Sequence, residues 1–124
     1  MRSATGRVKL IGERAVEVDA VFATGFPRSV MSLDLAREVG SFEELPEHLR
    51  YDLPTVKRGG SIRVVGTVWP SVEFDGCRVP STPLEVSADL AEGRFIVGRP
   101  HLDEWGVVFE EEPRLKTCPV GRLR

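Results

Sequence analysis

The sequence predicts a mostly β domain with many short strands and one or two short helices. Three observations lead to this prediction. Runs of alternating apolar and polar residues recur along the chain, Gly- and Pro-containing turns separate them, and only one segment has clear helical spacing of its apolar residues. With 124 residues, 41% of them hydrophobic and 29% charged, the chain is long enough to bury one core. We therefore expect a single domain over residues 1–124.

The first predicted elements are two strands that form a hairpin. Residues 7–11 alternate in polarity, and so do residues 16–22, in which every second side chain is apolar. Residues 12–14, Gly-Glu-Arg, separate the two runs and are predicted to form the turn. The second strand is expected to present one face to the core, formed by Val16, Val18, Ala20 and Phe22.

A short helix is predicted after this hairpin, at about residues 33–39. Ser32 can cap its start, and Gly40 suits the position just past its end. The following segment, residues 41–50, is predicted to add one or two helical turns interrupted by Pro46. The apolar stripe expected on the helix consists of Leu33, Ala36 and Val39.

The second half of the chain returns to strands. Residues 53–69 contain two strand-like runs around a glycine-rich tip, and residues 71–87 form another hairpin with Asp75-Gly76 at its turn. An apolar strand at residues 95–97 leads into a short helix-like segment and a further strand at about residue 107. Residues 113–124 are predicted to be an edge strand or a tail.

Composition narrows the classes of function. The net charge of −2 and pI of about 5.7 provide no sequence-wide basic field for nucleic acid or an anionic membrane. No apolar run approaches the length of a membrane span, and the polar N-terminus lacks the apolar region of a signal peptide. We therefore expect a cytoplasmic protein that binds neither nucleic acid nor membrane and needs no cofactor.

The two cysteines do not indicate a metal site. Cys77 and Cys118 are 41 positions apart, lack Cys-x-x-Cys spacing, and are accompanied by only two histidines, His48 and His101. We expect two reduced thiols without a role, and no bound metal. The alternative, a catalytic Cys-His pair, has no local signature in the sequence.

The most informative motif follows the second predicted strand. The apolar residues Val21 and Phe22 lead into Ala23-Thr24-Gly25, a turn and then the predicted helix. A shorter version recurs at residues 95–105, where an apolar strand ends in glycine and a helical segment follows. Glycine at a strand end is typical of close backbone approach. The repetition indicates a pseudo-twofold construction.

These two motifs resemble the signatures of the retropepsin-like aspartic peptidases, the single-domain type shared by retroviruses, archaea and bacteria. In that family an apolar pair precedes Asp-Thr/Ser-Gly, and a second apolar pair precedes a Gly and an Arg-x-x-Leu helix. The chain matches both at family-like spacing over residues 7–112, except that Ala23 stands where the family has Asp. The resemblance implies a closed β-barrel with one or two short helices, forming half of an acid-protease site.

The resemblance also implies a homodimer and a set of site residues. In the family each subunit supplies one Asp, and the pair shares a proton and activates a water that attacks the peptide carbonyl. The implied roles of Thr24, which holds the two loops together across the dimer, and of Gly25, which allows their close approach, carry over to this sequence. Residues 53–66 fall where the family has its substrate-covering flap. The residues implied to bind substrate are Phe26, Lys57, Arg58, Gly59, Gly60 and Ser61.

Ala23 has two explanations. It is an engineered Asp→Ala change in a working peptidase, which we favour because Thr24, Gly25 and the second signature are intact, or it marks a natural relative that lost catalysis. The first implies an inactivated aspartic endopeptidase acting on protein or peptide. The second implies a non-catalytic homodimeric module that binds extended peptides. Asp19 and Asp34 are expected to be surface charges that cannot replace the missing carboxylate.

A third reading is a small β-barrel that binds single-stranded nucleic acid. It would use Lys57, Arg58 and Arg63, with Trp69 as a stacking platform. We favour instead a polar hairpin tip with Trp69 in the core, because the basic cluster is small and the net charge is negative. Trp105 is also expected in the core.

Overall fold

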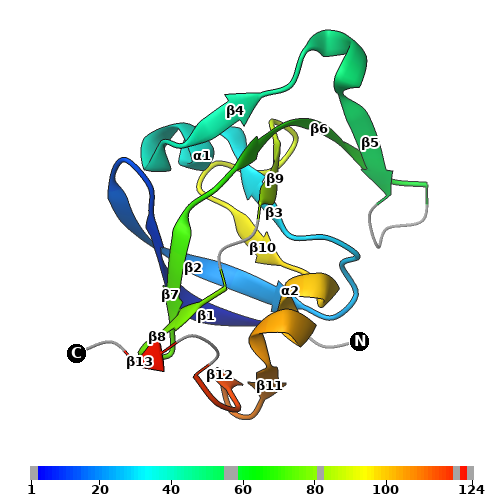
Figure 1. The fold of residues 1–124 in the computed structure, drawn as a ribbon. Helices are drawn as coiled ribbons and strands as arrows, with labels where there is room; N and C mark the ends of the chain where they lie inside the picture. The colour runs from blue at the N-terminus through cyan, green and yellow to red at the C-terminus, as the bar shows by residue number, and fades with distance from the viewer. Residues whose placement is uncertain (1–2, 55–58, 81–82, 119–120, 123–124) are drawn as a thin grey trace.

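The computed structural model describes residues 3–54, 59–80, 83–118 and 121–122, which form a mostly β domain (Figure 1). Two α-helices and one 3₁₀ helix accompany the strands: α1 (Leu33–Val39), α2 (Arg99–Trp105) and η1 (Glu47–Leu49). The strands are β1 (Ser3–Ile11), β2 (Ala15–Ala23), β3 (Val30–Ser32), β4 (Phe42–Glu44), β5 (Tyr51–Pro54), β6 (Ser61–Val68), β7 (Ser71–Phe74), β8 (Cys77–Val79), β9 (Leu84–Ser87), β10 (Phe95–Val97), β11 (Val107–Phe109), β12 (Pro113–Leu115) and β13 (Gly121–Arg122).

The predicted N-terminal hairpin is confirmed. Strands β1 and β2 pair antiparallel over their full length, from Ser3 opposite Ala23 to Ile11 opposite Ala15. Toward the C-terminal end of β2, the alternation buries Ala20 and Phe22 completely. The hairpin predicted over residues 71–87 is confirmed only for β7 and β8, where Asp75 and Gly76 both have positive φ, as a type I′ turn requires. Residues 84–87 leave it and form β9, which pairs with β3 and β6.

Strand β10 joins the two halves of the sheet. It pairs in parallel with β2 and antiparallel with β3, and β3 in turn pairs in parallel with β9. The full order is β13-β8-β7-β1-β2-β10-β3-β9-β6-β4, with β5 on β6. The segment that follows β2 is therefore fixed between elements from distant parts of the chain.

The closed barrel implied by the resemblance is not observed. Among the described residues, no hydrogen-bonded strand pair joins the two ends of the sheet. The chain passes from β6, near one end of this order, to β7, near the other end, through Trp69 and Pro70. Proline has no N–H to donate to a ladder, which explains why the strand is interrupted at this position.

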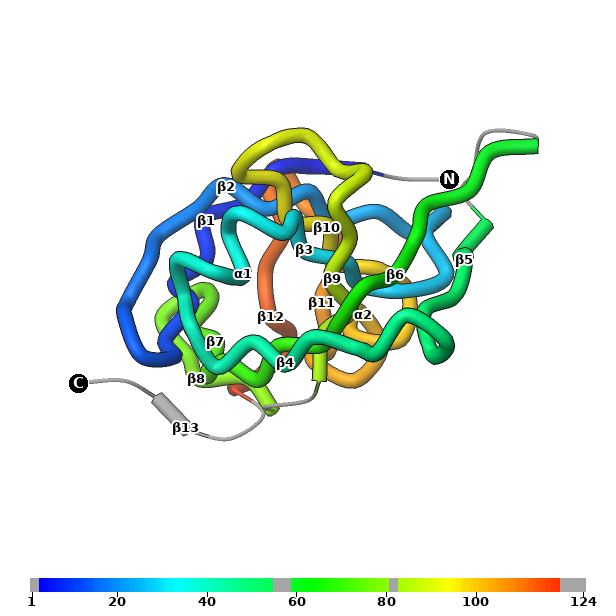
Figure 2. The backbone as a smooth tube through the Cα atoms, turned by 90° about the horizontal axis from the view of Figure 1, so that it is seen from above, coloured from blue at the N-terminus to red at the C-terminus, as the bar shows by residue number. Residues whose placement is uncertain are grey.

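The two helices lie on either side of β3 and β10 (Figures 1 and 2). Both contribute to one core, in which Ala36 and Trp105 are buried as predicted and Leu102 is buried as well. Leu33 is only half-buried, and Leu35 is buried instead. Neither helix, nor any other in the described part of the chain, has the length and apolar character to cross a membrane.

Residues 41–50 differ from the prediction of one or two helical turns. Phe42–Glu44 form strand β4, which pairs with the end of β6, and only η1 after Pro46 is helical. The half-buried side chain of Phe42 packs against the core, so tertiary packing outweighs the local preference.

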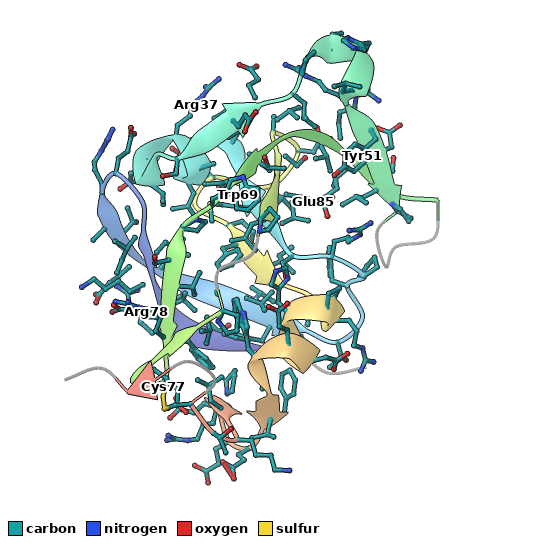
Figure 3. All side chains as sticks on the ribbon, viewed as in Figure 1. Arg37, Tyr51, Trp69, Cys77, Arg78 and Glu85 are labelled. Carbon is teal, nitrogen blue, oxygen red and sulfur yellow. A yellow bond between two sulfur atoms is a disulfide. The ribbon has the colours of Figure 1, made fainter. Side chains whose placement is uncertain are left out.

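Trp69 does not lie in the core, which contradicts the prediction; its side chain is 54% exposed (Figure 3). Val68 and Pro70 on either side of it are buried, so alternation turns Trp69 outward. Arg63, proposed beside it in the nucleic-acid reading, forms an ion pair with Asp52 at 3.3 Å.

The expectation of two reduced thiols is wrong, because Cys77 and Cys118 form a disulfide with 5.5 Å between their Cα atoms (Figure 3). Strand β13 pairs with β8 and so returns the end of the chain to Cys77. This non-local pairing has no sequence signal. Disulfides persist mainly in oxidising compartments and are rare in the cytosol. The bond therefore does not favour the cytoplasmic location, which stays a prediction.

Reduction of this disulfide is expected to lower the free energy of unfolding. A bond across 41 residues restricts the unfolded chain, and loop-closure entropy assigns it about 4 kcal/mol at most. Urea unfolding with and without a phosphine reductant measures the effect. The double variant Cys77→Ala, Cys118→Ala is the control and should not respond to the reductant. Two titratable thiols in the untreated, denatured chain would contradict the pairing.

Candidate functional site

The motif that carries the resemblance ends strand β2 and begins a turn. Ala23 is the last residue of β2, and only 6% of its surface is exposed. Thr24, Gly25 and Phe26 follow it and are each half-buried. The backbone N–H of Phe26 donates to the carbonyl of Ala23 at 3.3 Å, which closes the turn. The structure therefore keeps the four residues together at one strand end.

The second motif holds this turn in place. The backbone N–H of Arg99 donates to the carbonyl of Phe26 at 2.9 Å, and the N–H of Gly98 donates to Oγ of buried Ser29 at 2.8 Å. A Cβ on Gly98 would overlap the carbonyl of Arg28, so only glycine allows this approach. The two motifs that the sequence singled out are thus in direct contact.

The two nearby aspartates are engaged elsewhere, in agreement with their assignment as surface charges. Asp19 pairs with Arg7 at 3.2 Å on the outside of the hairpin. The carboxylate of Asp34 accepts the backbone N–H of Gly93 at 3.0 Å. Neither geometry presents a carboxylate beside Ala23.

The predicted substrate-binding residues of the hairpin lie between β5 and β6. Gly59 is exposed with positive φ, Gly60 is half-buried, and Ser61 begins β6 and is exposed. Lys57 and Arg58 lie outside the described residues. In Figures 1 and 2, β5 and the loop after β2 lie on the same side of the molecule.

Three residues that the sequence analysis did not single out, Arg28, Tyr51 and Glu85, link this hairpin to the loop between β2 and β3. Glu85 on β9 has both carboxylate oxygens occupied: Oε2 accepts the phenol of Tyr51 at 2.8 Å, and Oε1 lies 3.3 Å from Nη1 of Arg28. The Glu85 side chain is only 12% exposed, whereas that of Arg28 is 57% exposed. Figure 3 labels Glu85 and Tyr51. These residues are far apart in sequence, and no sequence motif predicts their contact.

Burial shifts the pKa values of two residues, Tyr51 on β5 and His101 on α2. Burial, together with the hydrogen bond to Glu85 and the charge of Glu85, raises the pKa of Tyr51 to about 12, opposed by the charge of Arg28. Burial lowers the pKa of His101, opposed by the charge of Glu104; its ring meets that of Trp105 edge-on at 5.4 Å between centroids. Among the described residues, no group of three or more His, Cys, Asp or Glu is placed to hold a metal ion.

Comparison with known proteins shows the fold. No family model and no curated protein sequence matches the chain. A solved structure, the retroviral protease-like domain of Ddi1 from Leishmania major, matches with a TM-score of 0.64 and 18% identity. The match covers 89% of this chain and 82% of that one. The fold of this chain is therefore similar to that of a retroviral protease-like domain.

Ser29→Ala is expected to destabilise the chain by about 1 to 3 kcal/mol, because it leaves the buried N–H of Gly98 without its acceptor. Urea unfolding measures the loss. Ser61→Ala, at an exposed serine, is the matched control and should change stability little. Equal effects of the two substitutions would contradict a framing role for Ser29.

The phenol of Tyr51 is expected to titrate at a pH of about 12 in the folded chain. Because the folded pKa is raised, the stabilising effect is present below pH 10 and is lost as pH rises from 10 through about 12. Tyr51 is the sole tyrosine of the chain, so phenolate absorbance reports it directly. Circular dichroism at each pH checks that the chain is folded.

Glu85→Gln is the comparison for this titration. It removes the negative charge but keeps a hydrogen-bond acceptor, so the midpoint should fall toward 10 without reaching it. A midpoint at or below 10 in the folded, unsubstituted chain would show that the pair is not formed.

Proposed function

We propose that the chain is a subunit of a homodimeric, retropepsin-type aspartic endopeptidase, inactive because Ala23 stands in place of the catalytic aspartate. One observation carries the proposal. Ala23 is buried at a strand end beside Thr24 and Gly25, in a turn framed by Gly98 and Ser29, within a fold similar to a retroviral protease-like domain. The frame is made by backbone groups and one hydroxyl, so it does not depend on the side chain at position 23.

The proposed site forms between two copies. Each copy supplies one position 23, and an aspartate at each would create a dyad that shares one proton, because two adjacent carboxylates cannot both ionise at low cost. One carboxyl then acts as base toward a water, and the other protonates the peptide oxygen. Thr24 and Gly25 are proposed to hold the two loops together, and the β5–β6 hairpin is proposed to cover the substrate.

A naturally non-catalytic peptide-binding module is the second candidate. Strand β5 pairs only with β6 among the described residues, so its outer edge offers backbone groups to an added peptide strand. The chain as it stands would then bind extended peptides without cleaving them. The native gene distinguishes the two: an Asp codon at position 23 favours the peptidase.

Ala23→Asp is expected to create a peptidase with an acidic optimum. Activity should be present while the dyad holds one proton and should fade as pH rises and both carboxyls ionise. The same ionisation should weaken the dimer, which sedimentation measures. Cleavage of a peptide library across acidic to neutral pH is the assay. Ala23→Asn matches the size of the new side chain without its charge and should cut nothing, as should the unsubstituted chain.

Loss of fold has to be separated from loss of chemistry in this assay. His101 is buried with a lowered pKa, so the unfolded chain takes up the proton first, and the stabilising effect of the neutral ring declines as pH falls below 6.5. Circular dichroism should therefore accompany each point. A folded, dimeric Ala23→Asp variant that cleaves no peptide would overturn the peptidase proposal and leave the binding module.

A further inference from the structure

The Arg28–Glu85–Tyr51 cluster has a geometry suited to recognising an anion. Glu85 is nearly buried and uses one carboxylate oxygen for each partner. Both oxygens of the Glu85 carboxylate therefore have partners within the protein. Arg28 instead leaves more than half of its side chain in solvent. An arginine whose planar fork is held at one end by a buried carboxylate offers its remaining N–H donors outward.

The backbone that carries Arg28 is held rigidly. Its carbonyl lies so close to Gly98 that no side chain fits there, and the next residue, Ser29, accepts the N–H of Gly98. The carbonyl of Ser29 also accepts the N–H of Glu85 at 3.3 Å, which joins the loop to β9. A guanidinium on such a loop loses little freedom when it binds a ligand, which favours recognition.

The location connects this cation to the site. Arg28 is five residues after Ala23 and two after Phe26, on the loop that the proposed dyad would share. Through Glu85 it is joined to Tyr51 at the start of β5, the first strand of the proposed covering hairpin. A peptide lying between loop and hairpin would pass the guanidinium. Arg63, a cation on the hairpin strand β6, is already paired with Asp52.

We propose that Arg28, oriented by Glu85, makes the site selective for peptides that carry an acidic side chain at the position lying over the loop. This inference rests on the proposed function and adds the substrate class. A carboxylate can meet the outward N–H groups in a charge-assisted, bidentate pair. The chain as a whole is negatively charged, so this local cation, rather than the overall field, would attract the acidic peptide.

The test uses peptide pairs that differ only by Glu or Gln at one position. Binding to the unsubstituted chain and cleavage by the Ala23→Asp variant are both measured. The Glu peptide is expected to be preferred by roughly tenfold for a half-exposed charged pair, and the preference should shrink as salt is added. Arg28→Gln should abolish the preference, and Arg28→Glu should shift it toward Lys peptides.

Two further variants separate the role of Arg28 from general charge effects. Arg14→Gln removes an equally charged, exposed side chain in the β1–β2 turn and should leave the preference unchanged. Glu85→Gln keeps the hydrogen bond to Tyr51 but releases the guanidinium, so selectivity should fall while binding of neutral peptides persists.

The outcomes distinguish the two proposals. Cleavage or binding of Glu and Gln peptides alike would overturn the role of Arg28 and leave the proposed function standing. If neither chain binds nor cleaves any peptide, the proposed function fails. In that case the selectivity for acidic peptides is overturned with it. Nuclear magnetic resonance titration of the Arg28 side chain with N-acetyl-glutamate amide against N-acetyl-glutamine amide then shows whether Arg28 recognises a carboxylate at all: a shift with glutamate alone shows that it does, and equal responses show that it does not.

Discussion

The contact between Gly98 and the loop after β2 is the constraint on which the candidate site depends. Parallel pairing of β10 with β2 places Val97 beside Phe22, so the two strands end at the same level. Beyond that point the backbone of Gly98 meets the carbonyl of Arg28 and the hydroxyl of Ser29. There is no room for a Cβ at Gly98. This glycine, which follows the strand of the second motif, therefore determines how the first motif is held.

This arrangement separates the frame of the site from its chemistry. The turn at Ala23 is closed by its own carbonyl and the N–H of Phe26, and it is tied to α2 through the N–H of Arg99. None of these contacts uses the side chain at position 23. A small apolar residue can therefore occupy the position without disturbing the loop.

A second network couples the loop to the β5–β6 hairpin. Glu85 places one nearly buried charge between Arg28 and Tyr51, and the pKa of Tyr51 of about 12 reflects how strongly the protonated phenol is favoured there. A buried carboxylate is costly unless it is fully hydrogen-bonded, so both partners stabilise it.

Local pattern in the sequence determined the β1–β2 hairpin, the Asp75-Gly76 turn, helix α1 and the two strand–glycine motifs, because alternation, positive φ and helical spacing act between near neighbours. Tertiary structure alone decided the rest. Trp69 faces solvent because its neighbours are buried, no strand pair among the described residues closes the sheet, and Cys77 meets Cys118 through the pairing of β13 with β8. Glu85 likewise joins Arg28 and Tyr51, which come from two other, distant segments. Such contacts depend on the packing of the whole chain, which no local pattern encodes.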